Sequence, residues 1–159
     1  HSYVGVDLMQ LGSLSISMGN YAEAEKRMRE SLEVFRQSLP DEHPYIAGGF
    51  ANLGRAILEQ GRWDDALSTL KHAVALEDKA FGPDSEEVAV ANVSLARVLA
   101  AKGQRPEAEE LFQRSYKTML QARGPHAQRT VQTREWIVDF YKKAGQEDRA
   151  LEFFRSVEA

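Results

Sequence analysis

Several features that would indicate a catalyst or a membrane protein are missing from this sequence of 159 residues. It contains no cysteine, which excludes a disulfide framework and a metal site built on thiolates. No stretch approaches 18 consecutive apolar residues, so we expect no transmembrane helix. A phosphate-binding glycine loop, a His-Glu-x-x-His motif and a nucleophile elbow are all absent from the sequence. We therefore predict that the chain is not an enzyme and carries no cofactor.

The net charge and the histidine positions argue against two further classes of ligand, nucleic acids and metal ions. A formal net charge of −4 and a pI near 5.6 argue against a nucleic-acid partner, because phosphate-binding surfaces are basic. Asp41, Glu42 and His43 are the most suggestive metal ligands. Three adjacent residues do not converge on an ion as a helix-spaced pair does, so we interpret them as linker residues and predict no metal site.

What the sequence does contain is a repeat with a period of 42 residues. A glycine recurs four times without insertion, and an alanine follows it each time, five residues later. The glycines are Gly19, Gly61, Gly103 and Gly145, and the alanines are Ala24, Ala66, Ala108 and Ala150. Eight positions before the glycines stand Leu11, Leu53, Leu95 and Ile137. A fixed period in this range indicates a repeat architecture.

Each copy has the pattern of two helices joined at the glycine. Apolar residues recur at helical spacing on both sides of Gly61, as in Phe50, Leu53 and Ile57 before it. A left-handed conformation at the glycine lets the first helix end, and a small residue such as Ala66 lets the two helices approach closely. Between copies, Pro and Gly stop the second helix, and Asp or Ser can cap the next. The pattern predicts helices over 2–18, 21–38, 44–60, 63–80, 86–102, 105–122, 128–144 and 147–158.

These residues resemble the tetratricopeptide repeat, in the 42-residue kinesin-light-chain-like type. The matching positions are Leu53, Gly54, Ile57, Gly61, Trp63 and Ala66, and the linker Gly82-Pro83-Asp84 is also similar to that type. The fourth copy is the least regular, because Glu147 replaces the aromatic residue and Val138 replaces the small residue. The resemblance implies an all-α fold, a right-handed superhelical solenoid of four tetratricopeptide-like helix-turn-helix repeats.

We expect one repeat domain over 1–159, with repeats at about 1–42, 43–84, 85–126 and 127–159. The pattern is already in register at the first residue, and the last helix is short, so we expect a fragment of a longer protein. We also expect apolar surface around Phe153, Phe154 and Val157, through which open repeat ends could associate end to end.

In such arrays the first helix of each pair lines the concave side, as the resemblance implies. The stripe of that helix opposite the core then forms the candidate ligand-binding groove. Its members are Gln10, Ser13, Asn52, Arg55, Glu59, Ser94, Arg97, Trp136, Asp139 and Lys143. Their amide, hydroxyl and guanidinium groups can hydrogen-bond the backbone or an acidic side chain of an extended peptide.

Two features of this stripe allow more than one interpretation. Arg55 and Arg97 occupy the same position in successive copies, which favours an acidic ligand, but both could instead pair with Glu59 or remain in water. Trp136 could be a ligand anchor, or it could pack against a following repeat.

The function predicted from this resemblance is a cytoplasmic scaffold for protein–protein interaction. Its partner is expected to be a protein or an extended, acidic peptide bound in the concave groove, with neither nucleic acid nor a membrane involved. The alternative is a regulatory or sensor module of a larger bacterial signalling protein, either a kinase or a transcription regulator. The resemblance is compatible with both.

Overall fold

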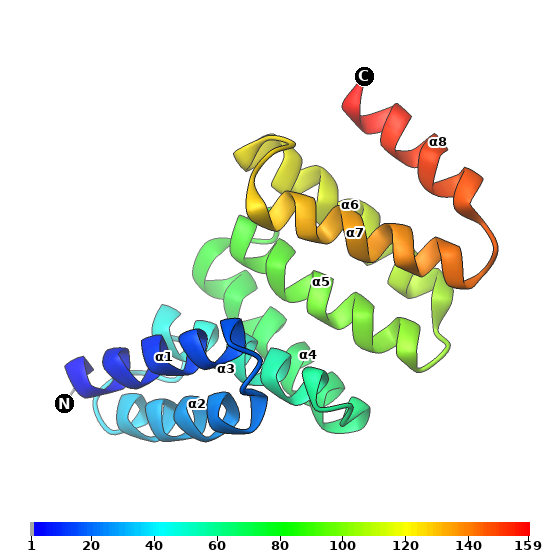
Figure 1. Ribbon diagram of the computed structural model, residues 1–159. Coiled ribbons are helices and arrows are strands. Elements are labelled where there is room, and N and C mark those ends of the chain that lie inside the picture. Colours follow the sequence, from blue (N-terminus) through cyan, green and yellow to red (C-terminus); the bar gives the residue numbers. More distant parts are fainter. Residues whose placement is uncertain (1) are drawn as a thin grey trace.

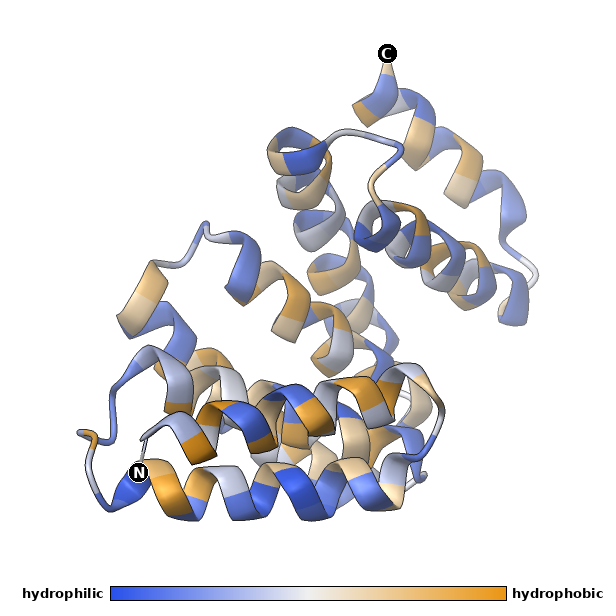
Figure 2. Ribbon diagram, turned by 60° about the vertical axis from the view of Figure 1, so that its left-hand side comes forward, coloured by the Kyte–Doolittle hydropathy of each residue, from blue (hydrophilic) through white to orange (hydrophobic). Residues whose placement is uncertain are grey.

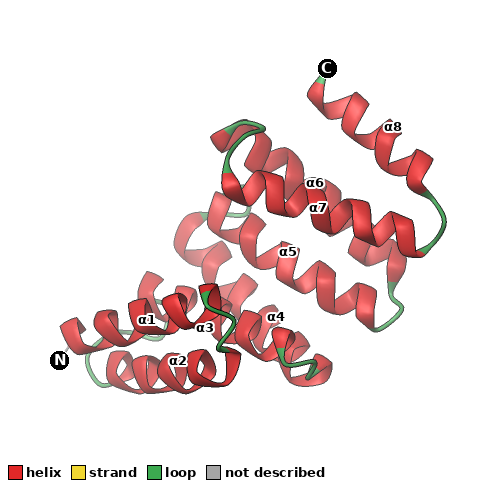
Figure 3. Ribbon diagram, in the orientation of Figure 1, coloured by secondary structure: helices red, strands yellow, loops and turns green. Residues whose placement is uncertain are grey.

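The computed structural model describes residues 2–159, and residue 1, where the predicted first repeat begins, lies outside this range. The described chain folds into helices joined by short loops, without a strand (Figures 1 and 3). The helices are α1 (Ser2–Ser17), α2 (Tyr21–Arg36), α3 (Pro44–Glu59), α4 (Trp63–Phe81), α5 (Glu86–Ala101), α6 (Arg105–Arg123), α7 (Gln128–Lys143) and α8 (Glu147–Glu158). The predicted all-α solenoid of four helix-turn-helix repeats is confirmed.

The helices begin and end at the residues that the repeat supplies for this purpose. Gly61 adopts φ = 76°, a conformation that side chains disfavour, and this lets the chain leave α3 and turn into α4. The starts of α3 and α5 are capped. The Ser85 hydroxyl accepts a hydrogen bond from the Val88 backbone N–H at 3.2 Å, and His43 Nδ1 accepts one from the Tyr45 N–H at 3.0 Å. His43 thus caps α3, where the linker pattern suggested Asp or Ser.

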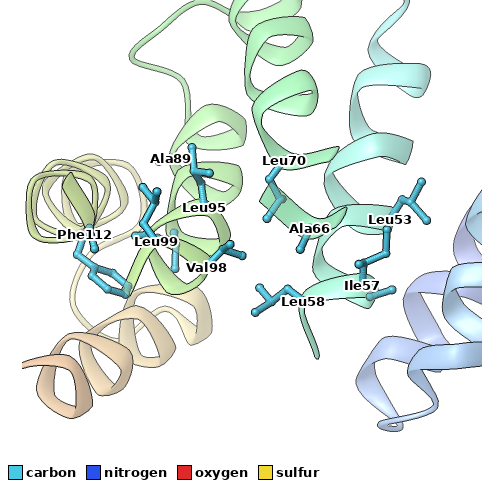
Figure 4. Close-up of a cluster of buried hydrophobic side chains, with 14 of the residues drawn as sticks. Leu53, Ile57, Leu58, Ala66, Leu70, Ala89, Leu95, Val98, Leu99 and Phe112 are labelled. Carbon is cyan, nitrogen blue, oxygen red and sulfur yellow. The ribbon is translucent and has the colours of Figure 1, made fainter. Parts of the chain in front are cut away.

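Small residues bring the two helices of a pair together. Ala66 is 0% exposed between α3 and α4, as predicted. A Cβ atom on Gly54 would lie 2.6 Å from Leu70 Cδ2, so the absence of a side chain at Gly54 is what permits this approach. Figure 4 shows Ala66 and Leu70 in this buried layer.

The leucines that recur at 42-residue intervals have a different role. Their side chains pack one repeat against the repeat before it. Leu53 points from α3 toward the first repeat and is 3% exposed (Figure 4). Leu11 holds the same repeat position but is 48% exposed, because residues 2–159 place no helix pair before α1. Large exposed apolar residues therefore gather on and directly after α1, the blue helix of Figure 1: Tyr3, Val4, Leu11, Leu14 and Met18. Figure 2 shows hydrophobic colouring alternating with hydrophilic colouring along the helices.

The C-terminal end differs from the prediction of exposed apolar surface. Phe153 and Phe154 are buried, and both rings pack edge-on against Tyr116 on α6. Arg134 lies over the Phe154 ring, with its Cζ 3.8 Å from the ring centroid. The prediction was wrong for these two residues because α8 turns them toward α6 and α7, leaving Val157 half-buried.

The two helices of the fourth repeat also pack less closely than those of the other repeats. Val138 replaces the small residue found at Gly12, Gly54 and Ala96, and its side chain is 41% exposed. Helix α8 therefore does not cover this position as α4 covers Gly54. In the part of the chain that the structure describes, no helix is both long enough and apolar enough to cross a membrane.

Candidate functional site

The first helices of the repeats line the inner side of the stack. Within residues 2–159, α1 contacts α3, α3 contacts α5, and α5 contacts α7, whereas the second helices are not joined to one another in this way. Elements on the inside of a curved stack approach each other more closely than those on the outside. The stripe predicted as a groove is therefore carried by the helices of the concave side.

Arg97 connects three helices across this groove. Its Nη1 donates to Glu59 Oε1 on α3 at 2.6 Å, and both side chains are largely shielded from solvent, with 20% and 19% of their surfaces exposed. Its Cζ also lies 4.3 Å from the ring centroid of Trp136 on α7. A guanidinium over an indole face is attracted by the negative π-surface of the ring. The interpretation that Arg97 pairs with Glu59 is therefore confirmed.

Trp136 occupies a position that neither sequence interpretation described. Its half-buried indole supports Arg97 of the preceding repeat, on the side of the groove away from any following repeat. An indole face that carries a guanidinium is less available to a ligand, and the anchoring role of Trp136 stays a prediction.

Arg55 differs from Arg97 in that its side chain has no ion-pair partner in the described chain. It is half-buried, and it makes neither a hydrogen bond nor an ion pair through its side chain with any of residues 2–159. Its Nε is fully buried without an acceptor. Burial lowers the pKa of the Arg55 guanidinium; Glu59 opposes this shift, and the like charges of Arg97 and Arg129 add to it. Arg55 is thus a desolvated cation beside two other cations.

Arg129, at the start of α7, is a further candidate for this site that the sequence reasoning missed. Its charge acts on Arg55 from α7 although the two residues are far apart in sequence. It makes no ion pair within the described part of the chain, and it is exposed. The signal was available in the repeat, because extending the groove stripe one turn toward the helix start leads to Tyr3, Tyr45, Glu87 and Arg129, which are 42 residues apart.

The remaining predicted residues are less central. Ser94 is buried, so its hydroxyl is not presented to a ligand, because α5 is packed on both sides. Asp139 and Lys143 pair with each other at 2.9 Å along the exposed surface of α7. Gln10 is exposed on α1, while Ser13 and Asn52 are half-buried. The structure therefore brings together Arg55, Glu59, Arg97 and Trp136.

The linker residues Asp41, Glu42 and His43 have structural partners. Glu42 accepts an ion pair from Lys79 Nζ at 2.9 Å, and His43 caps α3 through its ring nitrogen. Among residues 2–159 no group of three or more His, Cys, Asp or Glu side chains is arranged to hold a metal ion.

Among protein families, the chain matches the model described as "Tetratricopeptide repeat" over residues 7–76 and 45–121. Among curated proteins, the Clustered mitochondria protein homolog of Candida albicans is 23% identical over 117 residues, which is 74% of this chain and 9% of that protein. The protein Kinesin light chain-related 3 of Arabidopsis thaliana is 28% identical over 102 residues, 64% of this chain and 16% of that protein. The chain thus spans less than a fifth of the length of these two relatives.

Solved structures share the fold. A putative kinesin light chain of Podosopora anserina with nearly identical TPR-like repeats superimposes with a TM-score of 0.80 at 22% identity, covering 99% of this chain and 74% of the other. BtubC (BKLC) from P. vanneervenii superimposes with a TM-score of 0.75 at 23% identity, covering 96% of this chain and 61% of the other. At such identities the likeness concerns the arrangement of the helices.

Proposed function

The chain belongs to the tetratricopeptide repeat family, with repeats of the kinesin-light-chain-like type, and we propose that its concave groove binds an extended, acidic segment of a partner protein. Repeats of this family mediate protein–protein interaction. The proposed activity is that of a scaffold, in which the groove selects the partner and the rest of the solenoid holds the groove in shape.

The observation that carries this proposal is the unsatisfied guanidinium of Arg55. Its Nε is buried without an acceptor, and the charges acting on it include Arg97 and Arg129 but only one carboxylate, that of Glu59. An unpaired buried donor is costly, and a charged one more so. A carboxylate placed beside the Nη groups of Arg55 would pair with its charge and offset the repulsion between the three guanidinium groups.

The neighbouring residues favour an extended ligand. Asn52 lies three positions before Arg55 on α3, and therefore on the same face of that helix. Its amide can donate to a carbonyl and accept from an N–H, which suits the backbone of an extended peptide. Arg97 is already neutralised by Glu59, so it contributes to the shape of the groove and Arg55 supplies the charge that recognises the ligand.

The test uses fluorescent peptides about ten residues long in which Asp and Glu are either kept or replaced by Asn and Gln. We expect acidic peptides to bind the wild-type protein, and we expect Arg55→Ala to weaken that binding by about tenfold, which corresponds to 1.4 kcal/mol. Arg129→Ala should weaken it less, because Arg129 is exposed and its charge is screened.

Lys26→Ala provides the matched control, because Lys26 is an exposed cation on the second helix of the first pair. Its affinity should equal that of the wild type. The proposal fails if the amide peptides bind as tightly as the acidic ones, or if Arg55→Ala leaves the affinity of the acidic peptides unchanged while the protein remains folded by circular dichroism.

A further inference from the structure

Glu77 is a carboxylate at a position that the first and third repeats fill with apolar side chains. The equivalent residues 42 positions away are Phe35 and Met119, and both are buried. Glu77 is only 4% exposed, and its Oε2 is buried without a hydrogen-bond partner in the described chain. A buried carboxylate without a partner is costly, so this residue needs an explanation beyond packing.

The repeat shows what surrounds Glu77, because Phe35 has the same place one repeat earlier. The Phe35 ring packs against Gly5 of its own pair and lies 5.4 Å from the Tyr45 ring of the next repeat. The residues equivalent to Gly5 and Tyr45 are Ala47 on α3 and Glu87 on α5. Glu77 therefore lies at the junction of the second and third repeats, where α4 packs on α5.

The charged groups that act on Glu77 come from the following repeats. Glu87 in the first turn of α5 is a like charge, and Arg129 at the start of α7 is an opposite charge. On helix α3 the residue equivalent to Gly5 is Ala47, which is buried and has no titratable group. Burial, and then Glu87, raise the pKa of Glu77 to about 8, while Arg129 lowers it in part.

Glu87 and Arg129 also line a cavity of about 350 Å³ between the third and fourth repeats. The whole lining consists of Glu86, Glu87, Arg123, Ala127, Gln128 and Arg129. A polar space of this size can hold several water molecules. It leaves Glu87 and Arg129, whose charges act on Glu77, room to move when the charge at the junction changes.

We propose that Glu77 is a proton-operated joint between the second and third repeats. When its carboxyl group is protonated, it packs in the core position that Phe35 and Met119 occupy elsewhere. When it is ionised, it is repelled by Glu87 and must reach water or Arg129, so α5 moves away from α4 at this end. Because each repeat of a solenoid contacts only its neighbours, a change at one junction reorients the two halves of the stack.

The joint would also regulate the groove. Arg55 lies on α3, before the junction, and Arg129 lies on α7, after it, so opening the junction changes the spacing between them. This consequence for ligand binding rests on the proposed function, whereas the movement of the joint does not. The movement can therefore be tested without any ligand.

The natural absence of cysteine makes this test direct, since two introduced cysteines can be labelled uniquely. Glu33→Cys on α2 and Arg114→Cys on α6 place nitroxide labels on exposed positions of the two halves. Double electron–electron resonance then gives the distribution of distances between the labels from pH 6 to pH 9.5. We expect a reversible shift in this distribution with a midpoint near pH 8.

Two variants of Glu77 and one variant of Glu87 test whether Glu77 causes the shift in the distances. Glu77→Met, which reproduces Met119, and Glu77→Gln should both abolish the shift, and Glu87→Gln should move its midpoint to lower pH by removing the like charge. The proposal is overturned if the doubly labelled protein shows the same distribution at all pH values. It is also overturned if the shift persists in Glu77→Gln or Glu77→Met.

Discussion

The guanidinium of Arg97 on α5 lies 4.3 Å from the centre of the Trp136 ring on α7. The same side chain reaches back to Glu59 on α3, so a single residue links the first helices of three successive repeats. These are residues of the same groove stripe in different copies of the repeat. The contact makes Arg97 part of the framework of the groove, in contrast to Arg55 at the equivalent position one repeat earlier.

Arg97 and Arg55 should therefore respond oppositely to substitution. Arg97→Ala removes a shielded ion pair and a cation–π contact, and we expect a loss of unfolding free energy on the order of 2 kcal/mol. Arg55→Met keeps the aliphatic stem and removes a desolvated, unpaired charge, so stability should stay equal or rise by up to about 1 kcal/mol. Urea unfolding followed by circular dichroism measures both. A larger loss for Arg55→Met than for Arg97→Ala would contradict this division of roles.

Leu53 and Leu11 give a matched pair at one repeat position. Leu53→Ala removes a side chain buried against the preceding repeat, and we expect a loss of about 2–5 kcal/mol. Leu11→Ala makes the same chemical change on an exposed face of α1, and its cost should stay below about 1 kcal/mol. Thermal or urea unfolding of the two variants compares them directly, and equal losses would mean that the face of α1 is covered in solution.

The pKa of Glu25 predicts how the free energy of unfolding decreases at low pH. Burial alone would raise its pKa, but hydrogen bonds from Arg62, Arg29 and Gln60 lower it from 4.5 to about 2. A lowered pKa means that the carboxylate stabilises the fold above pH 4.5 and that this contribution is lost as the pH falls toward 2. For a partly screened group we expect a contribution on the order of 2 kcal/mol.

Urea unfolding at pH 7, 4 and 2.5 tests this expectation with Glu25→Gln. The variant should be less stable than the wild type at pH 7, and the difference should shrink as the pH falls. Glu33→Gln serves as the control, because Glu33 is exposed on the same helix and makes no ion pair with residues 2–159. A difference that is independent of pH would show that the ion pairs of Glu25 do not stabilise the contact between the first and second repeats.

Much of the fold follows from the spacing of residues along the chain. The glycines and alanines at 42-residue intervals determine where each helix ends and where two helices approach, and both were predicted from the sequence for Gly61 and Ala66. These features are local, since a left-handed turn and a small contact residue act within one repeat. The helix bounds differ from the predicted ones by no more than two residues.

The exposure of the end repeats did not follow from the sequence. Leu11 and Leu53 have the same place in the pattern, yet within residues 2–159 only Leu53 is covered by a preceding repeat. Phe153 and Phe154 were expected to be exposed, but the orientation of α8 buries them against Tyr116. A periodic pattern describes an average repeat, and burial at an end depends on which neighbours are present.

By itself, the sequence determined the repeat and the helices, because both depend on periodicity, and it predicted the stripe of residues on the first helix of each pair. Only the tertiary structure determined the interaction partners of each charged side chain. It paired Arg97 with Glu59 and Trp136, left Arg55 without an acceptor, and brought Arg129 and Glu87 to bear on the buried Glu77. The physical reason is that electrostatic interactions depend on distance and burial between different repeats, and a pattern read along one chain contains neither.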